Sequence, residues 1–170
     1  MNILVAYASK YSATQGIAEK IADVLRQAGL QADVLPVMQV RSLAPYDVVI
    51  LGSAVYVGKW MKNACDFMSK HEETLAQLPV WIFSSGPTGE GDPVDLLEGW
   101  RLPADQEPII DRIQPRGVAV FHGNIDAARV NFVERMAVQA LKKPFGDFRD
   151  WEAITSWAST IAETVRQPAL

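Results

Sequence analysis

Hydroxyl groups cluster between the first apolar run of the chain and the helical pattern that follows it. Free N–H groups at the start of a helix and the helix dipole both favour a bound anion, and hydroxyl groups add further donors. The cluster therefore predicts a site for a phosphate monoester. A lone hydroxyl at such a position commonly caps the helix instead, which is the alternative role for Ser12 or Thr14. The residues of this first turn are Ser9, Lys10, Tyr11, Ser12, Ala13 and Thr14.

The first turn lacks the two glycine-rich patterns that mark common nucleotide sites. It contains neither G-x-x-x-x-G-K-[ST], which cradles a nucleoside triphosphate, nor G-x-G-x-x-G, which holds a dinucleotide. A mononucleotide therefore fits this turn better than either of those larger ligands.

A second turn combines small and aromatic residues directly after a buried run. Gly58 can adopt backbone angles that are closed to other residues, and a flat aromatic ligand fits against Tyr56 or Trp60. The alternative is that these aromatic side chains pack on the helix that follows. Tyr56 is the stronger candidate for a ligand contact. The residues of this second turn are Ser53, Ala54, Val55, Tyr56, Val57 and Gly58.

A third turn follows another buried run and is rich in glycine and hydroxyl groups. Because it has little side-chain bulk, its backbone N–H groups can approach the polar edge of a heterocycle closely. The residues of this third turn are Ser85, Gly86, Pro87, Thr88 and Gly89.

Short apolar runs supply the strands that must position these turns. The runs are continuous rather than alternating, which is typical of strands covered on both faces in a parallel sheet. Apolar residues at helical spacing precede Gly29, and another strand pattern follows it, which completes a βαβ unit. The predicted strands cover residues 3–8, 32–37, 48–51, 80–83 and 118–121.

Helices alternate with these strands, which predicts a doubly wound α/β sheet. They cover residues 62–78 and 104–113, and residues 86–103 form a loop. After the last strand, one helical pattern covers residues 126–142 and another follows an Asp150 cap. One helix completes a simple five-stranded sheet, so the first of these two is an addition. In such sheets ligands bind at the carboxyl ends of the strands, where the three turns lie.

Composition limits the classes of function. The chain has 170 residues, 49% of them apolar, and a net charge of −4, which fits one domain over residues 1–170 and argues mildly against a nucleic-acid partner. Cys65 is the only cysteine, so no internal disulfide forms, and no Cys/His group has metal-ligand spacing. No apolar stretch approaches the roughly 20 residues that span a bilayer, and no basic leader opens the chain, so we expect a cytoplasmic protein.

At these three turns the sequence resembles the flavodoxin-like FMN-binding family. Among its branches, the sequence is similar to the flavodoxin-domain group that includes the menaquinone-dependent protoporphyrinogen dehydrogenases. The resemblance covers essentially the whole chain and is strongest over residues 5–14 and 52–58. It implies an FMN cofactor and a flavodoxin-like, five-stranded parallel sheet in the order 2-1-3-4-5, with an extra helix after the last strand.

The phosphate loop of flavodoxins usually reads T-x-T-G-x-T, and here Ser9, Tyr11, Ser12 and Thr14 occupy the marked positions. Serine in place of glycine restricts the backbone of this loop. By resemblance, the second turn would flank the isoalloxazine ring, with Tyr56 as the main contact. The third turn would meet the pyrimidine edge of the same ring.

The resemblance implies electron transfer as the function, in one of two forms. The chain is either an FMN-binding electron carrier without a substrate of its own, or a flavin-dependent dehydrogenase of the protoporphyrinogen/quinone type. The third alternative is a regulatory FMN-binding module without a redox function. The sequence shows neither a substrate cleft nor a quinone-reducing surface, so it does not decide whether the chain is an enzyme. A redox partner protein or a quinone is the expected partner.

Charge is distributed unevenly in the second half of the chain. Residues 90–112 are strongly acidic, and such a loop either is simply solvated or lowers the flavin potential and steers a basic redox partner. Residues 129–143 are basic apart from Glu134, with apolar residues interleaved. This second pattern predicts a core helix with a solvated basic face, and peripheral contact with an anionic membrane is the less favoured alternative.

Two other functions use similar folds but do not match these residues. A phosphoacceptor domain needs acidic residues after the first and third strands, where Ser9 and Ser53 stand here. A hydrolase would combine Ser53 or Ser85 with His122, yet neither serine lies in G-x-S-x-G. We therefore interpret His71 and His122 as surface or packing residues.

Overall fold

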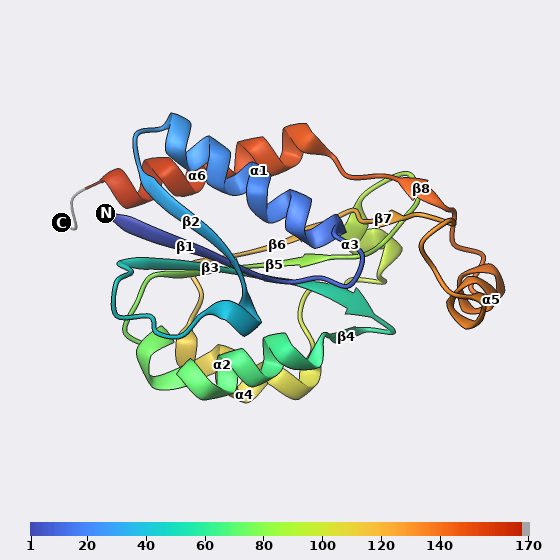
Figure 1. Ribbon diagram of the computed structural model, residues 1–170, viewed down its shortest axis with the longest axis horizontal. Helices are drawn as coiled ribbons and strands as arrows, with labels where there is room; N and C mark the ends of the chain where they lie inside the picture. The colour runs from blue at the N-terminus through green and yellow to red at the C-terminus, as the bar shows by residue number, and fades with distance from the viewer. Residues whose placement is uncertain (168–170) are drawn as a thin grey trace.

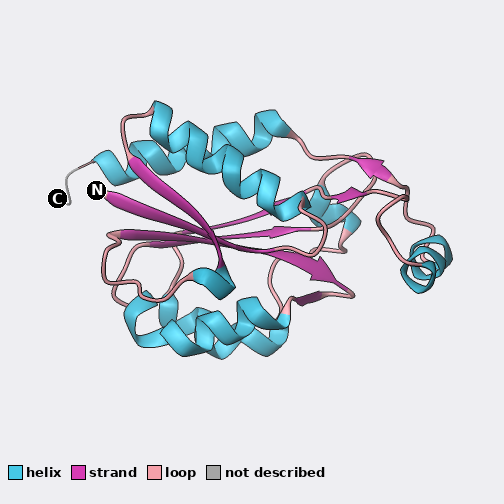
Figure 2. Ribbon diagram, viewed as in Figure 1, coloured by secondary structure: helices cyan, strands magenta, loops and turns pink. Residues whose placement is uncertain are grey.

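The computed structural model describes residues 1–167, and the last three residues of the predicted 1–170 domain lie outside the described residues. A parallel sheet is sandwiched between two layers of helices (Figures 1 and 2). Helices α1 (Ala13–Gln27) and α6 (Trp151–Arg166) cover one face, and α2 (Lys62–Leu75) and α4 (Glu107–Ile113) cover the other (Figure 1). This is the doubly wound α/β architecture that the sequence predicts.

The parallel strands of the sheet are β1 (Asn2–Ala8), β2 (Gln31–Pro36), β3 (Val48–Tyr56), β5 (Val80–Ser85) and β6 (Gly117–Phe121). They lie in the order β2-β1-β3-β5-β6, which confirms the predicted order 2-1-3-4-5. A short strand, β4 (Lys59–Trp60), pairs antiparallel with β3. The winding reverses between β1 and β3, so the switch point, where ligands bind in such sheets, lies at their carboxyl ends.

The continuous apolar runs are explained by burial on both faces of the sheet. Successive side chains of a strand point to opposite faces. In β1, Ile3 and Val5 pack with α1 and α6, whereas Leu4 and Ala6 pack with α2 and α4. All four side chains are fully buried. If β1 slipped by one residue, the side chains on its two faces would change places. The packing therefore fixes the register of the strands, and with it the position of their carboxyl ends.

Local capping sets the ends of the helices beside the sheet. Gly29 has a φ of +81° after α1, which is the left-handed C-cap that the sequence predicts. The Asp150 carboxylate accepts hydrogen bonds from the backbone N–H groups of Glu152 and Ala153, at 3.0 and 2.9 Å, and caps α6 as predicted.

Two helices are shorter than the sequence predicts, and the predicted loop is partly ordered. The helix expected over residues 62–78 ends at Leu75. In the helix expected over residues 104–113, the first three residues form a 3₁₀ helix, and the α-helical part begins at Glu107, with Pro108 in its first turn, where proline is tolerated. The predicted loop over residues 86–103 contains one short helix. The remaining short elements are η1 (Val37–Gln39), α3 (Pro93–Leu96) and η2 (Ala104–Gln106).

The segment after β6 adds β7 (Asn124–Ile125), α5 (Phe132–Ala140) and β8 (Gly146–Asp147). The helix predicted over residues 126–142 is thus confined to its middle part, where Asn131 and Glu134 form a capping box. The prediction that this is a core helix is wrong, because no residue of α5 is buried. Both faces of the sheet are already covered, and α5 lies beyond its end (Figure 1).

Candidate functional site

A pocket of about 270 Å³ opens at the carboxyl ends of β1, β3 and β5, and we call it the main pocket. The predicted turns contribute Ser9, Tyr11, Ala13, Thr14, Ala54, Val55, Tyr56, Val57, Ser85 and Gly86 to its lining. The segment after β6 contributes Gly123, Asn124, Ile125, Val130, Glu134, Ala137, Val138, Leu141 and Lys143. A second pocket of about 200 Å³, the side pocket, is lined by Tyr11, Ser12, Ala13, Asn124, Asp126, Arg129 and Arg149.

The first turn leads into α1 through a strained residue. Ser12 occupies the N-cap position with φ 68° and ψ 1°, in the left-handed region that glycine favours. Its side chain makes no capping hydrogen bond, so it does not serve as a conventional cap. Thr14 is fully buried, and its Oγ1 has no hydrogen-bond partner. A buried hydroxyl without a partner is costly, which points to a ligand acceptor at this place.

The second turn is a tight hairpin between β3 and β4. Tyr56 pairs with Lys59, and Val57 and Gly58 between them have φ values of +50° and +69°. Positive φ at both central residues is the mark of a type I′ turn, and it is strained for a β-branched residue such as Val57. The Tyr56 ring lies in the lining of the main pocket and is 45% exposed. Burial is the main cause that raises the pKa of its phenol above the ordinary value.

Trp60 follows the packing alternative rather than the ligand alternative. Its ring is buried in the core, and its Nε1 donates to the Ser84 hydroxyl at 2.9 Å. Ser53 is also structural: its hydroxyl donates to the carbonyl of Ala54 and accepts from the backbone N–H of Met61. Neither residue lines the main pocket.

The third turn approaches the pocket with its backbone. A Cβ added to Gly123 would lie 3.1 Å from Cα of Gly86, so these two glycines face each other closely. The ring nitrogens of His122 lie 3.2 and 2.8 Å from the carbonyl oxygens of Pro87 and Gly91. His122 therefore holds the third turn in place, in agreement with its interpretation as a packing residue.

The predicted site residues are brought together unevenly. Of those in the three turns, the main and side pockets do not include Lys10, Ser53, Gly58, Pro87, Thr88 and Gly89. Thr88 is buried, and its Oγ1 also has no partner. For all residues of the three turns, inside and outside the pockets, a role in cofactor binding stays a prediction.

Sequence reasoning missed the outer wall of the main pocket, which α5 and its flanks provide. Val130, Val138 and Leu141 lie on this wall. The apolar pattern within residues 129–143, to which they belong, had predicted a core helix instead. A usable signal was present in the turn after β6, where Gly123 and Asn124 follow the end of a strand at the same edge of the sheet.

A polar cluster ties α5 to the first turn. The Glu134 carboxylate receives hydrogen bonds from the Lys10 ammonium, the Tyr11 hydroxyl and, at 3.0 Å, the backbone N–H of Asn131. The bonds from Lys10 and Tyr11 are the main causes that lower the pKa of Glu134 from 4.5 to about 2. Glu134 is therefore ionised at neutral pH, and it links the outer wall of the main pocket, formed by α5, to the first turn on the opposite side.

Neither a metal centre nor a bilayer-spanning helix is found among the described residues. Within residues 1–167, no group of three or more His, Cys, Asp or Glu side chains is placed to hold a metal ion. Over the same range, no helix combines the length and the apolar character needed to cross a bilayer.

Comparison with known proteins decides the family. The family model described as a flavodoxin domain matches residues 4–151. The chain belongs to the flavodoxin domain family. FMN is the cofactor that membership implies.

The relatives combine low sequence identity with high coverage. The protoporphyrinogen IX dehydrogenase [quinone] of Escherichia coli K12 is 24% identical over an alignment that covers 100% of this chain and 99% of that protein. The protein of the same name from Leishmania major is 25% identical, covering 89% of this chain and 72% of that protein. The structure of an archaeal flavodoxin aligns with a TM-score of 0.63 at 14% identity, covering 98% of this chain and all of that one.

The residues of the site fit FMN. The unpartnered Thr14 hydroxyl at the start of α1 can donate to a phosphate oxygen. Tyr11 and Tyr56 give the main pocket aromatic surfaces for a flavin ring. Gly86 and Gly123, which both line the main pocket, have no side chains and pack backbone against backbone, so they offer main-chain groups to a ligand without side-chain bulk.

Proposed function

We propose that this chain binds FMN in the main pocket and uses it to transfer electrons to a redox partner protein or a quinone. The observation that carries the proposal is the combination of Thr14, buried without a hydrogen-bond partner at the start of α1, with an aromatic-lined pocket at the switch point of the sheet. Bound FMN supplies the redox chemistry. The protein supplies orientation, exclusion of water and the charges near the ring.

The residues of the pocket divide this work. The apolar wall formed by Val55, Ile125 and Val138 excludes water from one side of the pocket. Tyr56 is exposed enough to lie against a ring at the mouth of the pocket. The Thr14 hydroxyl holds the phosphate end. Such a division leaves one edge of the ring near the surface, as electron exchange with a partner requires.

A visible absorption spectrum tests this proposal. Purified protein is titrated with FMN, and the complex is reduced stepwise under argon. We expect saturable flavin bands that bleach reversibly on reduction. If no FMN binds at micromolar concentrations, the proposal is wrong.

A second candidate function is FMN-dependent dehydrogenation with a quinone as electron acceptor. It is favoured by the wall from α5, which encloses the main pocket beyond what the five-stranded sheet provides, and by the names of the two relatives above. The test is anaerobic oxidation of protoporphyrinogen by the FMN-loaded protein with menaquinone. Turnover above the free-FMN rate supports this candidate, whereas binding of FMN without turnover leaves the electron carrier.

The exposed side of α5 indicates what kind of surface the protein could contact. Phe132, Val133 and Met136 are exposed, and Arg135 and Lys142 lie near them in the chain. An apolar and basic surface of this kind is compatible with transient contact with an anionic membrane, where a quinone resides. Co-sedimentation with vesicles of phosphatidylglycerol tests this contact, and neutral vesicles are the control.

A further inference from the structure

We propose that Arg129 and Arg149, which lie outside the first turn, form a cationic clamp for the cofactor phosphate and make the chain selective for phosphorylated flavin. This inference rests on the proposed binding of FMN. The clamp closes the side pocket, which shares Tyr11, Ala13 and Asn124 with the main pocket. A ligand that lies in the main pocket can therefore extend one end into the clamp.

Arg149 is built into the start of α1. Its Nη1 donates to the carbonyl of Ala13 at 3.3 Å, and its Nε and Nη2 donate to Asp147 at 2.8 and 2.6 Å. The side chain is only 15% exposed, and its guanidinium lies over the Trp151 ring, 4.6 Å from the centroid. These contacts hold the guanidinium in one place before any ligand binds.

Gly16 supplies the space for this arrangement. A Cβ at position 16 would lie 2.6 Å from Nη1 of Arg149. Glycine inside a helix is less favourable than alanine by roughly 0.5–1 kcal/mol. Its presence in α1 is explained by the arginine that it admits.

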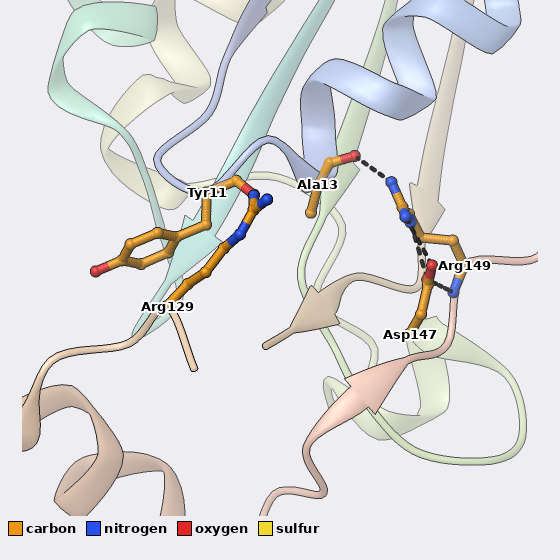
Figure 3. A network of polar contacts seen from close by, with 5 residues as sticks. All are labelled: Tyr11, Ala13, Arg129, Asp147 and Arg149. Carbon is orange, nitrogen blue, oxygen red and sulfur yellow. Dashed lines mark hydrogen bonds and ion pairs between the residues drawn. The ribbon is translucent and has the colours of Figure 1, made fainter. Parts of the chain in front are cut away.

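Arg129 reaches the same turn from the other side. Its Nη1 donates to the carbonyl of Tyr11 at 3.4 Å, and its Nε lies 3.6 Å from the carboxylate of Asp126. Figure 3 shows the two arginines on opposite sides of the start of α1, with Ala13 between them. Arg129 lies in the segment before α5, and Arg149 lies between β8 and α6, so the chain on both sides of the β7–β8 pair supplies the two charges.

The electrostatics of this placement favour an anion. The positive end of a helix dipole repels cations, so two guanidinium groups at the start of α1 are unfavourable unless negative charge is present. Asp126 and Asp147 each pair with one of the two guanidinium groups, and Asp126 itself lines the side pocket. A phosphate dianion matches the planar donors of arginine and would replace Asp126, whose oxygen lies 3.6 Å away, as the partner of Arg129. The unpartnered Thr14 hydroxyl lines the main pocket and follows Ala13, a residue that both pockets share, so a phosphate at the start of α1 could meet Thr14 as well as the clamp.

The experiment compares FMN with riboflavin, which lacks the phosphate. Dissociation constants of both are measured by fluorescence quenching for the wild type and for the variants Arg129→Gln and Arg149→Gln. The matched control is Arg116→Gln, which removes an arginine that lies over Trp81, away from both pockets. Circular dichroism checks folding. Arg129 is 60% exposed, so its variant remains a test even if Arg149→Gln unfolds.

We expect Arg149→Gln to weaken FMN binding about 10- to 100-fold and Arg129→Gln about 3- to 10-fold, from the usual strength of charge-assisted hydrogen bonds. Riboflavin binding should change less than about twofold, and Arg116→Gln should behave as the wild type. Millimolar inorganic phosphate should compete with FMN but not with riboflavin.

Two results would overturn the clamp. FMN affinity could be unchanged in both arginine variants, or the affinities for FMN and riboflavin could fall in parallel. In either case the proposed function would stand, because the wild type would still bind FMN. A wild type that binds neither flavin would instead contradict the proposed function itself, and the clamp with it.

Discussion

Helices α1 and α5 both line the main pocket, but they are held in the structure by different forces. The apolar side of α1 packs on the sheet and includes Ile17, Ile21 and Leu25, all fully buried. The apolar residues of α5 lie partly on the pocket wall and partly in solvent, and none is buried. Polar contacts from Glu134 to the first turn hold α5 in place. One helix is therefore part of the core, and the other is specific to the site.

The comparison teaches that a hydrophobic pattern alone does not say what a helix covers. Burial of α1 stabilises the fold whether or not a ligand is bound. The position of α5 has a use only if something occupies the pocket that it closes. We therefore expect changes in α1 to act mainly on stability and changes in α5 to act mainly on the pocket.

The largest expected effect is on stability. Ile21→Ala removes a fully buried side chain of α1 and should lower the free energy of unfolding by about 2–5 kcal/mol. Met136→Ala on α5, where the side chain is 54% exposed, should change it by less than about 0.5 kcal/mol. Urea unfolding followed by circular dichroism measures both. Equal losses from the two variants would remove the distinction between the helices.

A change that removes the charge of Glu134 but keeps its size should loosen α5 without affecting α1. In Glu134→Gln, the carboxylate that joins Lys10 and Tyr11 is lost, so the amides of residues 132–140 should exchange with solvent about 10-fold faster. Hydrogen exchange read by mass spectrometry reports this, and Glu163→Gln on α6 is the control. If protection of α5 does not change, the polar cluster does not hold the helix.

Acid should produce the same loosening in the wild type. The folded-state pKa of Glu134, about 2, lies below its ordinary value of 4.5. The ionised carboxylate therefore stabilises the tether fully above about pH 4.5, and this contribution is lost as the pH falls toward 2. Exchange in α5, corrected for intrinsic rates and compared with α1, should rise over this range in the wild type. In Glu134→Gln it should not.

The smallest expected effect concerns the start of α1. Ser12→Gly relieves a left-handed backbone conformation and should raise the free energy of unfolding by up to about 1 kcal/mol. Thermal unfolding measures the change. A lower melting temperature would mean that the serine side chain makes a stabilising contact.

The parts of the structure that depend on burial were predictable from the sequence. Continuous apolar runs fixed β1, β3 and β5, and the three turns therefore had to meet at one edge. The role of Trp60 was left between two alternatives, because an aromatic residue after a strand can face either the core or a ligand. Only the hydrogen bond from its indole to Ser84 decides for the core.

The wall from α5 and the two arginines were beyond sequence reasoning. A helical pattern such as Val130, Val133 and Ala137 has the same period whether it faces a core or a pocket. The approach of Arg149 to Ala13 joins residues far apart in the chain, and no local pattern encodes it. The one local trace is Gly16, whose meaning depends on the arginine that packs against it.

The pairing of β7 with β8 places Ile125 opposite Gly146, so residues 126–145 leave and rejoin the fold at a single point. Residues 126–145 therefore form a module that is inserted into the chain at one place. Such a module can lengthen, shorten or be replaced over evolution without disturbing the strands, because closing a loop of different length costs little free energy. Exchange of this one segment would change the outer wall of the main pocket and would remove Arg129, while the three turns at the carboxyl ends of the strands are kept.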